Sequence, residues 1–70
     1  MRTIGEAMLR ARRRAGYTVR ELAEEAGVGQ STIYRAEGNE LYPSLMTVVA
    51  CADVLGISID EYIGRGQEKE

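Results

Sequence analysis

Apolar residues along this 70-residue chain fall in short groups spaced three or four positions apart, which is the period of an amphipathic α-helix. Five such groups are separated by segments that contain glycine, proline, serine or threonine. They predict helices at about residues 4–15, 19–26, 30–37, 45–55 and 59–63. No segment alternates apolar and polar residues as a half-buried strand does. The pattern therefore predicts an all-α fold, a compact five-helix domain.

Helix starts and stops are marked independently of the apolar pattern. Three Ser or Thr residues are each followed three positions later by Glu, the capping-box spacing, and Ser44 before Leu45 predicts a further cap. The three pairs are Thr3 with Glu6, Thr18 with Glu21, and Ser58 with Glu61. The first four helices are each followed by a glycine that favours termination, namely Gly16, Gly27, Gly38 and Gly56, and Asn39 accompanies Gly38 at the third stop.

The predicted core lies on the inward faces of these helices. Its members after the first helix are Val19, Leu22, Ala23, Ala26, Ile33, Ala36, Leu45, Val48, Cys51, Ala52 and Leu55. The last residues, G-R-G-Q-E-K-E, offer no apolar anchor. We therefore expect one domain over residues 1–64 and a flexible tail over 65–70.

Composition narrows the possible functions. There is no run of about 20 apolar residues for a membrane helix, and the N-terminus does not look like a signal peptide. With no His and only Cys51, the usual zinc sites cannot form, and no disulfide framework is available. No nucleophile–base pair or phosphate-binding glycine loop is present. We expect a cytoplasmic protein without a cofactor that is not an enzyme.

Charge is unevenly distributed along the chain. The net charge of −2 and the pI near 5.1 argue against a nucleic-acid partner, since affinity for phosphate comes mainly from Lys and Arg. Residues 1–20, however, carry six arginines against Glu6 alone, whereas residues 21–70 carry three basic and ten acidic side chains. A local basic surface can steer DNA although the total is acidic. Arg13 and Arg14 are explained at least as well as positive charge at a helix C-terminus.

The stretch from Thr18 to Glu37 has the spacing of two helices that meet at a tight turn. Ala23 is small enough for close helix contact, and Gly27 four residues later tolerates a positive φ. Val28 can pack beneath the turn and Ile33 can anchor the second helix. Together these constraints predict a helix-turn-helix. The alternative is a plain helical hairpin in which the same residues serve packing only.

Beyond this motif, the chain resembles the lambda-repressor-like family of DNA-binding domains, also called the Cro/C1 or Xre type. The resemblance covers about residues 4–63, through I-G-E-A-M, E-L-A-E-E-A-G-V-G-Q-S-T-I-Y-R and the P-S-L-M-T-V-V and A-D-V-L-G-I-S-I-D-E-Y-I segments. It implies a sequence-specific DNA-binding transcriptional regulator, of the repressor or antitoxin type. It also implies that the helix starting at Gln30 is the recognition helix.

Side-chain chemistry supports this assignment of the recognition helix. Gln30 can pair bidentately with adenine and Arg35 with guanine, while Ser31 can bind a base or a phosphate. Tyr34 can contact a thymine methyl or a phosphate, and Thr32, where the helix turns away, is a lesser candidate. The alternative is that these side chains form an ordinary solvated face. An exposed aromatic residue, Tyr34, beside hydrogen-bond donors argues against this alternative, because such a residue more often marks a contact surface.

Two positions depart from the family pattern. Val19 stands where family members often have a Gln that holds a phosphate; Thr18, Arg20 and the helix N-terminus are the substitutes we expect. The loop after the recognition helix, often basic in the family, has Asn39, which we retain as a DNA-binding candidate, and Glu40, which would repel phosphate. The alternative function is therefore a protein-interaction module on a helix-turn-helix scaffold, with weak or no DNA binding.

The resemblance also implies a brace and a dimer. Arg12 and Glu37 match positions that form a partly buried ion pair in some family members, which would hold the recognition helix against the first helix. Family members usually bind palindromic double-stranded DNA operators as two-fold dimers. The last helix and its approach carry surplus apolar residues, so we expect a homodimer through Ile57, Ile59, Tyr62 and Ile63.

Overall fold

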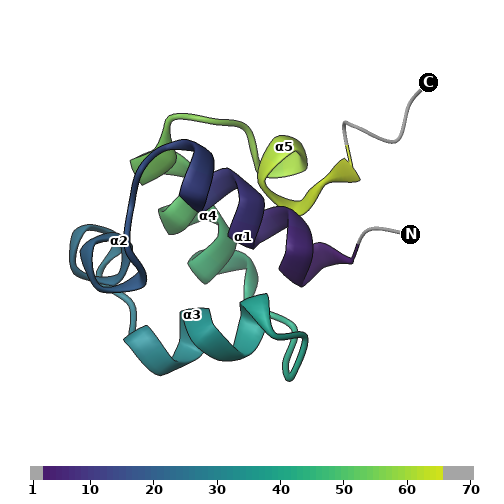
Figure 1. Cartoon of the computed structure of the whole chain (residues 1–70), viewed down its shortest axis with the longest axis horizontal. Helices are drawn as coiled ribbons and strands as arrows, with labels where there is room; N and C mark the ends of the chain where they lie inside the picture. The colour runs from purple at the N-terminus through teal and green to yellow at the C-terminus, as the bar shows by residue number, and fades with distance from the viewer. Residues whose placement is uncertain (1–2, 66–70) are drawn as a thin grey trace.

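The computed structural model describes residues 3–65 and contains the five predicted helices (Figure 1). They are α1 (Ile4–Arg14), α2 (Val19–Ala26), α3 (Gln30–Glu37), α4 (Leu45–Leu55) and α5 (Ile59–Ile63). Residues 3–65 contain no strand, so the predicted all-α fold is confirmed. The first helix ends one residue earlier than predicted, because Ala15 is its C-cap.

Local capping explains where the helices begin. Thr3 and Thr18 each accept a hydrogen bond from the backbone N–H three residues on, at 3.1 and 3.0 Å, and Glu6 and Glu21 complete both capping boxes. At Ser58 only one half of the predicted box forms, the bond from the Glu61 N–H. One cap is enough there, since a terminal helix of five residues is held mainly by packing.

The helices end at the predicted stop residues. Gly16, Gly27 and Gly56 have positive φ values between 73° and 82°, the left-handed conformation that stops a helix. After α3, where Gly38 and Asn39 are the predicted stop, Gly38 has a φ of −87° and Asn39 takes the left-handed position with a φ of 63°.

The helices pack in a closed ring around one core, in the order α1, α3, α2, α4 and α5, with α5 back against α1. Figure 1 shows α1 between α3 on one side and α5 on the other. The largest fully buried side chains come from all five helices: Met8, Leu22, Ile33, Cys51 and Tyr62. One core therefore fixes α3 relative to the rest of the domain.

Two apolar residues lie where the sequence pattern did not place them. Leu45, predicted as core, is 68% exposed, while Val48, Cys51 and Ala52 on α4 are buried as predicted. Because α4 is apolar almost all round, its pattern does not single out one inward face, and its first turn extends past the core. Tyr62, predicted at a dimer surface, is completely buried, so this assignment was wrong.

The structure describes only the first residue of the predicted tail and contains neither a membrane-spanning helix nor a metal-binding cluster within residues 3–65. The predicted tail at 65–70 lies, apart from Arg65, outside the described residues. None of the helices found in residues 3–65 has the length and apolar character needed to cross a membrane. Within the same residues, no group of three or more His, Cys, Asp or Glu side chains is placed to hold a metal ion.

Candidate nucleic-acid interface

The turn between α2 and α3 has the geometry of a helix-turn-helix. Gly27 adopts a φ of 73°, and its N–H donates to the Ala23 carbonyl at 2.9 Å. The next N–H, from Val28, donates to the same carbonyl at 3.1 Å. Ala23 is 3% exposed and Ile33 is fully buried, so the small contact position and the anchor lie where the motif requires them.

A buried ion pair braces α3 against α1, as the family resemblance implied. The Arg12 guanidinium donates from Nε to Glu37 Oε2 at 2.8 Å and from Nη2 to Glu37 Oε1 at 3.0 Å. The two side chains are only 10% and 7% exposed. A third bond, from Arg12 Nη1 to the Tyr17 carbonyl at 2.8 Å, ties in the loop before α2. The hydrogen bond to Glu37 raises the pKa of Arg12.

A second link joins the loop after α3 to the start of α1. The Gly5 N–H donates to Asn39 Oδ1 at 3.1 Å, and Asn39 Nδ2 donates to Thr3 Oγ1 at 3.0 Å. The helices approach so closely here that a Cβ on Gly5 would lie 2.5 Å from the Glu37 carbonyl oxygen and 2.6 Å from that of Ala36. The side chain of Asn39, a predicted DNA-binding residue, is thus engaged in holding α3 to α1.

The outward side of α3 presents the predicted reading residues together. Gln30, Ser31, Tyr34 and Arg35 are all exposed, and Thr32 is half-buried. Ile33 and Ala36 on the same helix are buried, so the polar and apolar residues are separated on opposite sides. Gly29, the N-cap, has no side chain with which to cap α3. The first backbone N–H groups of α3 therefore add to the donors at this surface.

The residues expected to contact phosphate at the start of α2 are exposed, but each already has a partner within the domain. Thr18 is exposed, but its hydroxyl oxygen already caps α2 by accepting from the Glu21 N–H. Arg20 is exposed and forms a 3.5 Å ion pair with Glu24 one helical turn on. Val19, the departure from the family pattern, is 5% exposed and belongs to the core. The start of α2 therefore carries one exposed cation, Arg20, and this cation is paired with Glu24.

One acidic side chain lies directly beside the exposed side chains of α3. Glu40 Oε1 is 3.9 Å from Arg35 Nε, with both side chains about two-thirds exposed. The same segment is held in place by the Glu40 N–H, which donates to the Arg35 carbonyl at 2.8 Å. An exposed pair of this kind is weak and adjustable. It partly neutralises the one arginine on the outward side of α3.

Sequence reasoning missed the roles of Gly5 and Asn39. Glycine in the interior of a helix is unfavourable, so the capped helix beginning at Ile4 carried a signal that its partner comes unusually close. The partner itself is 34 residues away, and no local pattern identifies it.

Fold and surface together define a helix-turn-helix DNA-binding domain. The helix-turn-helix family model matches residues 8–62, most of the chain. The chain therefore belongs to this family, the lambda-repressor-like or Cro/C1 type found in transcriptional regulators.

Individual relatives agree with this assignment. The chain is 34% identical over 62 residues to the cryptic phage CTXphi transcriptional repressor RstR of Vibrio cholerae, covering 89% of this chain but 55% of RstR. The N-terminal DNA-binding domain of SinR from Bacillus subtilis superposes with a TM-score of 0.79 at 33% identity, covering 86% and 88% of the two chains. SinR in complex with DNA gives 0.76 at 35% identity, covering 80% and 90%. The chain thus spans about half the length of the curated relative that it matches.

Proposed function

We propose that this domain reads double-stranded DNA in the major groove with the exposed side of α3 and acts as a transcriptional repressor. The observation that carries the proposal is the separation of the two sides of α3. Gln30, Ser31, Tyr34 and Arg35 face outward, while Ile33 and the ion pair of Arg12 with Glu37 hold the helix to the core. The relatives support it, since RstR is named as a repressor and SinR has been solved with DNA.

Each outward side chain has a role in this proposal. Gln30 pairs with adenine and Arg35 with guanine, each pairing discriminating by roughly 1–3 kcal/mol, whereas Ser31 and Tyr34 supplement them. Thr18, Arg20 and the N-terminus of α2 contact phosphate, with Thr32 as a lesser contact. Asn39 acts through position, because it anchors the loop that follows α3. In this proposal the domain binds DNA in the cytoplasm and catalyses no reaction.

We further propose that the domain binds a palindromic operator as a homodimer. An apolar groove with a volume of about 280 Å³ opens between the connector after α3 and the last two helices. It is lined by Ile4, Tyr42, Pro43, Leu45, Ile59 and Ile63, and we call it the apolar groove. Tyr42 and Leu45 are 86% and 68% exposed, and exposed apolar surface of this kind marks interaction sites.

The proposed interface differs in part from the one expected from the sequence. Ile59 and Ile63 line the apolar groove, whereas Ile57 faces a separate groove and Tyr62 is buried. Tyr42 and Pro43 lie in the connector between α3 and α4, a few residues after α3 ends at Glu37. A second copy seated on the apolar groove would therefore lie beside the recognition helix, as two-fold reading of neighbouring half-sites requires.

Selection of bound duplexes from a random pool at moderate salt tests DNA reading. We expect enrichment of a palindrome with half-sites about 10 base pairs apart, centre to centre. Gln30→Ala and Arg35→Ala should each lose discrimination at one base position while the fold is retained. If no sequence is enriched among the bound duplexes, the proposal that the domain binds specific DNA sequences is wrong.

Salt separates DNA reading from the alternative of a protein-interaction module. The Glu40 carboxylate beside Arg35 is the observation that favours this alternative. DNA affinity falls steeply as salt rises, because binding releases counterions from phosphate. A protein partner whose binding survives both high salt and Gln30→Ala would favour the alternative instead.

A further inference from the structure

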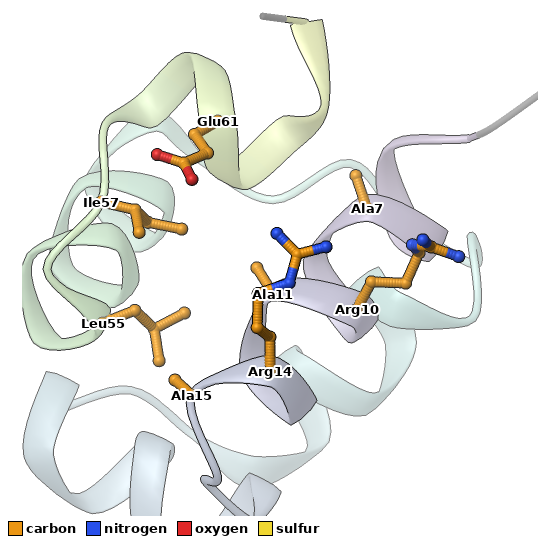
Figure 2. Close-up of a pocket in the computed structure, with 8 residues that line it drawn as sticks. All are labelled: Ala7, Arg10, Ala11, Arg14, Ala15, Leu55, Ile57 and Glu61. Atoms are coloured by element: carbon orange, nitrogen blue, oxygen red, sulfur yellow. The ribbon is translucent and has the colours of Figure 1, made fainter. Parts of the chain in front are cut away.

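A second groove lies on the other side of α1 and is not used in DNA reading. Figure 2 shows it between α1 and the segment that runs from the end of α4 into α5, with a volume of about 220 Å³. Ala11 and Ala15, one helical turn apart, form its floor, and the buried Ala7 also lines it. Leu55 and Ile57 form the facing wall. We call it the alanine groove.

The alanine groove lies away from the exposed side of α3 that we propose to contact DNA. The side of α1 that carries Gly5 and Arg12 is packed against α3. Ala7 and Ala11 are turned toward α5 instead, and Figure 1 shows α3 and α5 on opposite sides of α1. A molecule bound in the alanine groove would therefore not compete with DNA at α3.

Three charged side chains line the groove beside its apolar residues. Arg10 and Arg14, one turn apart on α1, both line the groove and are exposed. Figure 2 shows Arg14 reaching across the groove toward α5 while Arg10 points outward. Glu61 lies on the facing side. No ion pair within residues 3–65 involves Arg10 or Arg14, so both guanidiniums are available to carboxylates of a partner.

The size of the groove favours a protein partner over a small ligand. Sites that enclose small molecules typically have volumes of roughly 300–1,000 Å³, whereas this groove has about 220 Å³ and is open to solvent. Alanines along one helix face allow another helix to approach closely, since they project little from the backbone. An amphipathic helix in such a groove places apolar side chains on the floor and its polar residues at the edges.

We propose that the alanine groove docks an acidic amphipathic helix of a partner protein. Apolar side chains of the partner pack on Ala11, Leu55 and Ile57, and its carboxylates pair with Arg10 and Arg14. Glutamates one turn apart on the partner match the spacing of the two arginines. This docking is independent of DNA reading, and partner and operator can be held at the same time.

Two synthetic peptides serve as probes. Both are fluorescein-labelled amphipathic helices with the same leucine and alanine face, one with glutamates flanking that face and one with lysines in their place. Fluorescence anisotropy with the full chain, without DNA, should give at least about tenfold tighter binding of the acidic peptide. Arg10→Glu combined with Arg14→Glu should reverse this preference.

Arg13→Glu is the matched control, because Arg13 is an exposed arginine of the same helix that does not line the groove. It should change the affinity for the acidic peptide by less than about twofold, and methyl NMR shifts on adding the peptide should centre on Ala11, Leu55 and Ile57. Equal binding of both peptides, no binding of either, or an equal loss in Arg13→Glu would overturn the proposal. So would shifts of the same methyl groups on self-association alone, which would assign the groove to a second copy of the chain.

Discussion

The Arg12 guanidinium and the Glu37 carboxylate join α1 to the end of α3 through two parallel hydrogen bonds, in a site where each side chain is at least 90% buried. Removing one partner leaves a buried charge without compensation. Glu37→Gln or Arg12→Met should therefore lower the free energy of unfolding by ~3–5 kcal/mol. Urea denaturation at neutral pH measures the loss.

The double variant Arg12→Met with Glu37→Leu provides the control for this brace. Replacing both charges by apolar groups should restore much of the stability, because neither charge is then stranded. If the two single losses simply add in the double variant, the residues do not act as a pair.

Gly5→Ala tests the close approach of α1 and α3. Alanine is the better helix former by ~0.8–1.0 kcal/mol, so an open site would be stabilised. Here the new Cβ would meet the backbone oxygens of Ala36 and Glu37, which cannot move aside without separating the helices. We expect a loss of ~1–3 kcal/mol in chemical denaturation. A gain in stability would mean that the helices separate without cost.

Tyr62→Phe tests a buried hydroxyl that has no hydrogen-bond partner within the described residues. Burial is the main cause that raises the pKa of Tyr62, and the Cys51 thiol raises it less. Removing an unsatisfied hydroxyl while keeping the ring should leave stability at pH 7 unchanged or raise it by up to ~1 kcal/mol. A clear loss in urea denaturation would show that the hydroxyl is satisfied.

The same two groups predict alkaline destabilisation. Burial raises the pKa of Tyr62 and of Cys51 above their ordinary values of 10.0 and 9.0. The folded chain then keeps protons that the unfolded chain releases, so stability is full below pH 9 and falls as pH rises through 9 and 10. The slope approaches ~1.4 kcal/mol per pH unit for each group.

Tyr62→Phe again supplies the comparison for the pH effect. Between pH 9 and pH 11 it should lose less stability than the parent chain, by about 1 kcal/mol, because one of the two groups is gone. Identical pH profiles would exclude a contribution from Tyr62.

Glu40→Gln should strengthen DNA binding. It removes a carboxylate 3.9 Å from Arg35 and close to where phosphate would lie. Exposed charges contribute about 0.2–1 kcal/mol, so we expect affinity to rise by a factor of about 1.4 to 5 at moderate salt. Glu25→Gln, which lies on α2 and bonds only to the Tyr17 hydroxyl among the described residues, is the control. Equal gains in both variants would indicate a general charge effect.

Leu45→Asp should prevent dimer formation if the apolar groove is the interface. A carboxylate there would be buried without a partner against the second copy. Sedimentation equilibrium should show a monomer, with loss of cooperative binding to a palindrome. Met46→Asp, an equally exposed neighbour that does not line the groove, should dimerise as before.

The sequence was sufficient for those parts of the fold that local chemistry determines. Caps such as Thr18, stops such as Gly27 and the small residue Ala23 act within a few positions, and all are found where the pattern predicted. The outward position of Gln30 and Arg35 follows from the same short-range period.

What the sequence did not reveal depends on contacts between distant segments. The bond between Gly5 and Asn39 joins residues 34 positions apart, and the burial of Tyr62 depends on where α5 docks. The exposure of Leu45 also depends on distant segments, because an almost uniformly apolar helix can turn several faces inward. Which face does so is decided by the neighbouring helices.

Asn39 and the ion pair of Arg12 with Glu37 hold the end of α3 at two points. The end of α3 is therefore held firmly, and in the proposed role of α3 as recognition helix little conformational freedom would be lost on entering a groove. A firmly held helix would not adapt its angle to each duplex, so the duplex would bend or change its groove width to fit. Operators should then be selected partly for flexibility, at base pairs that no side chain of this domain touches.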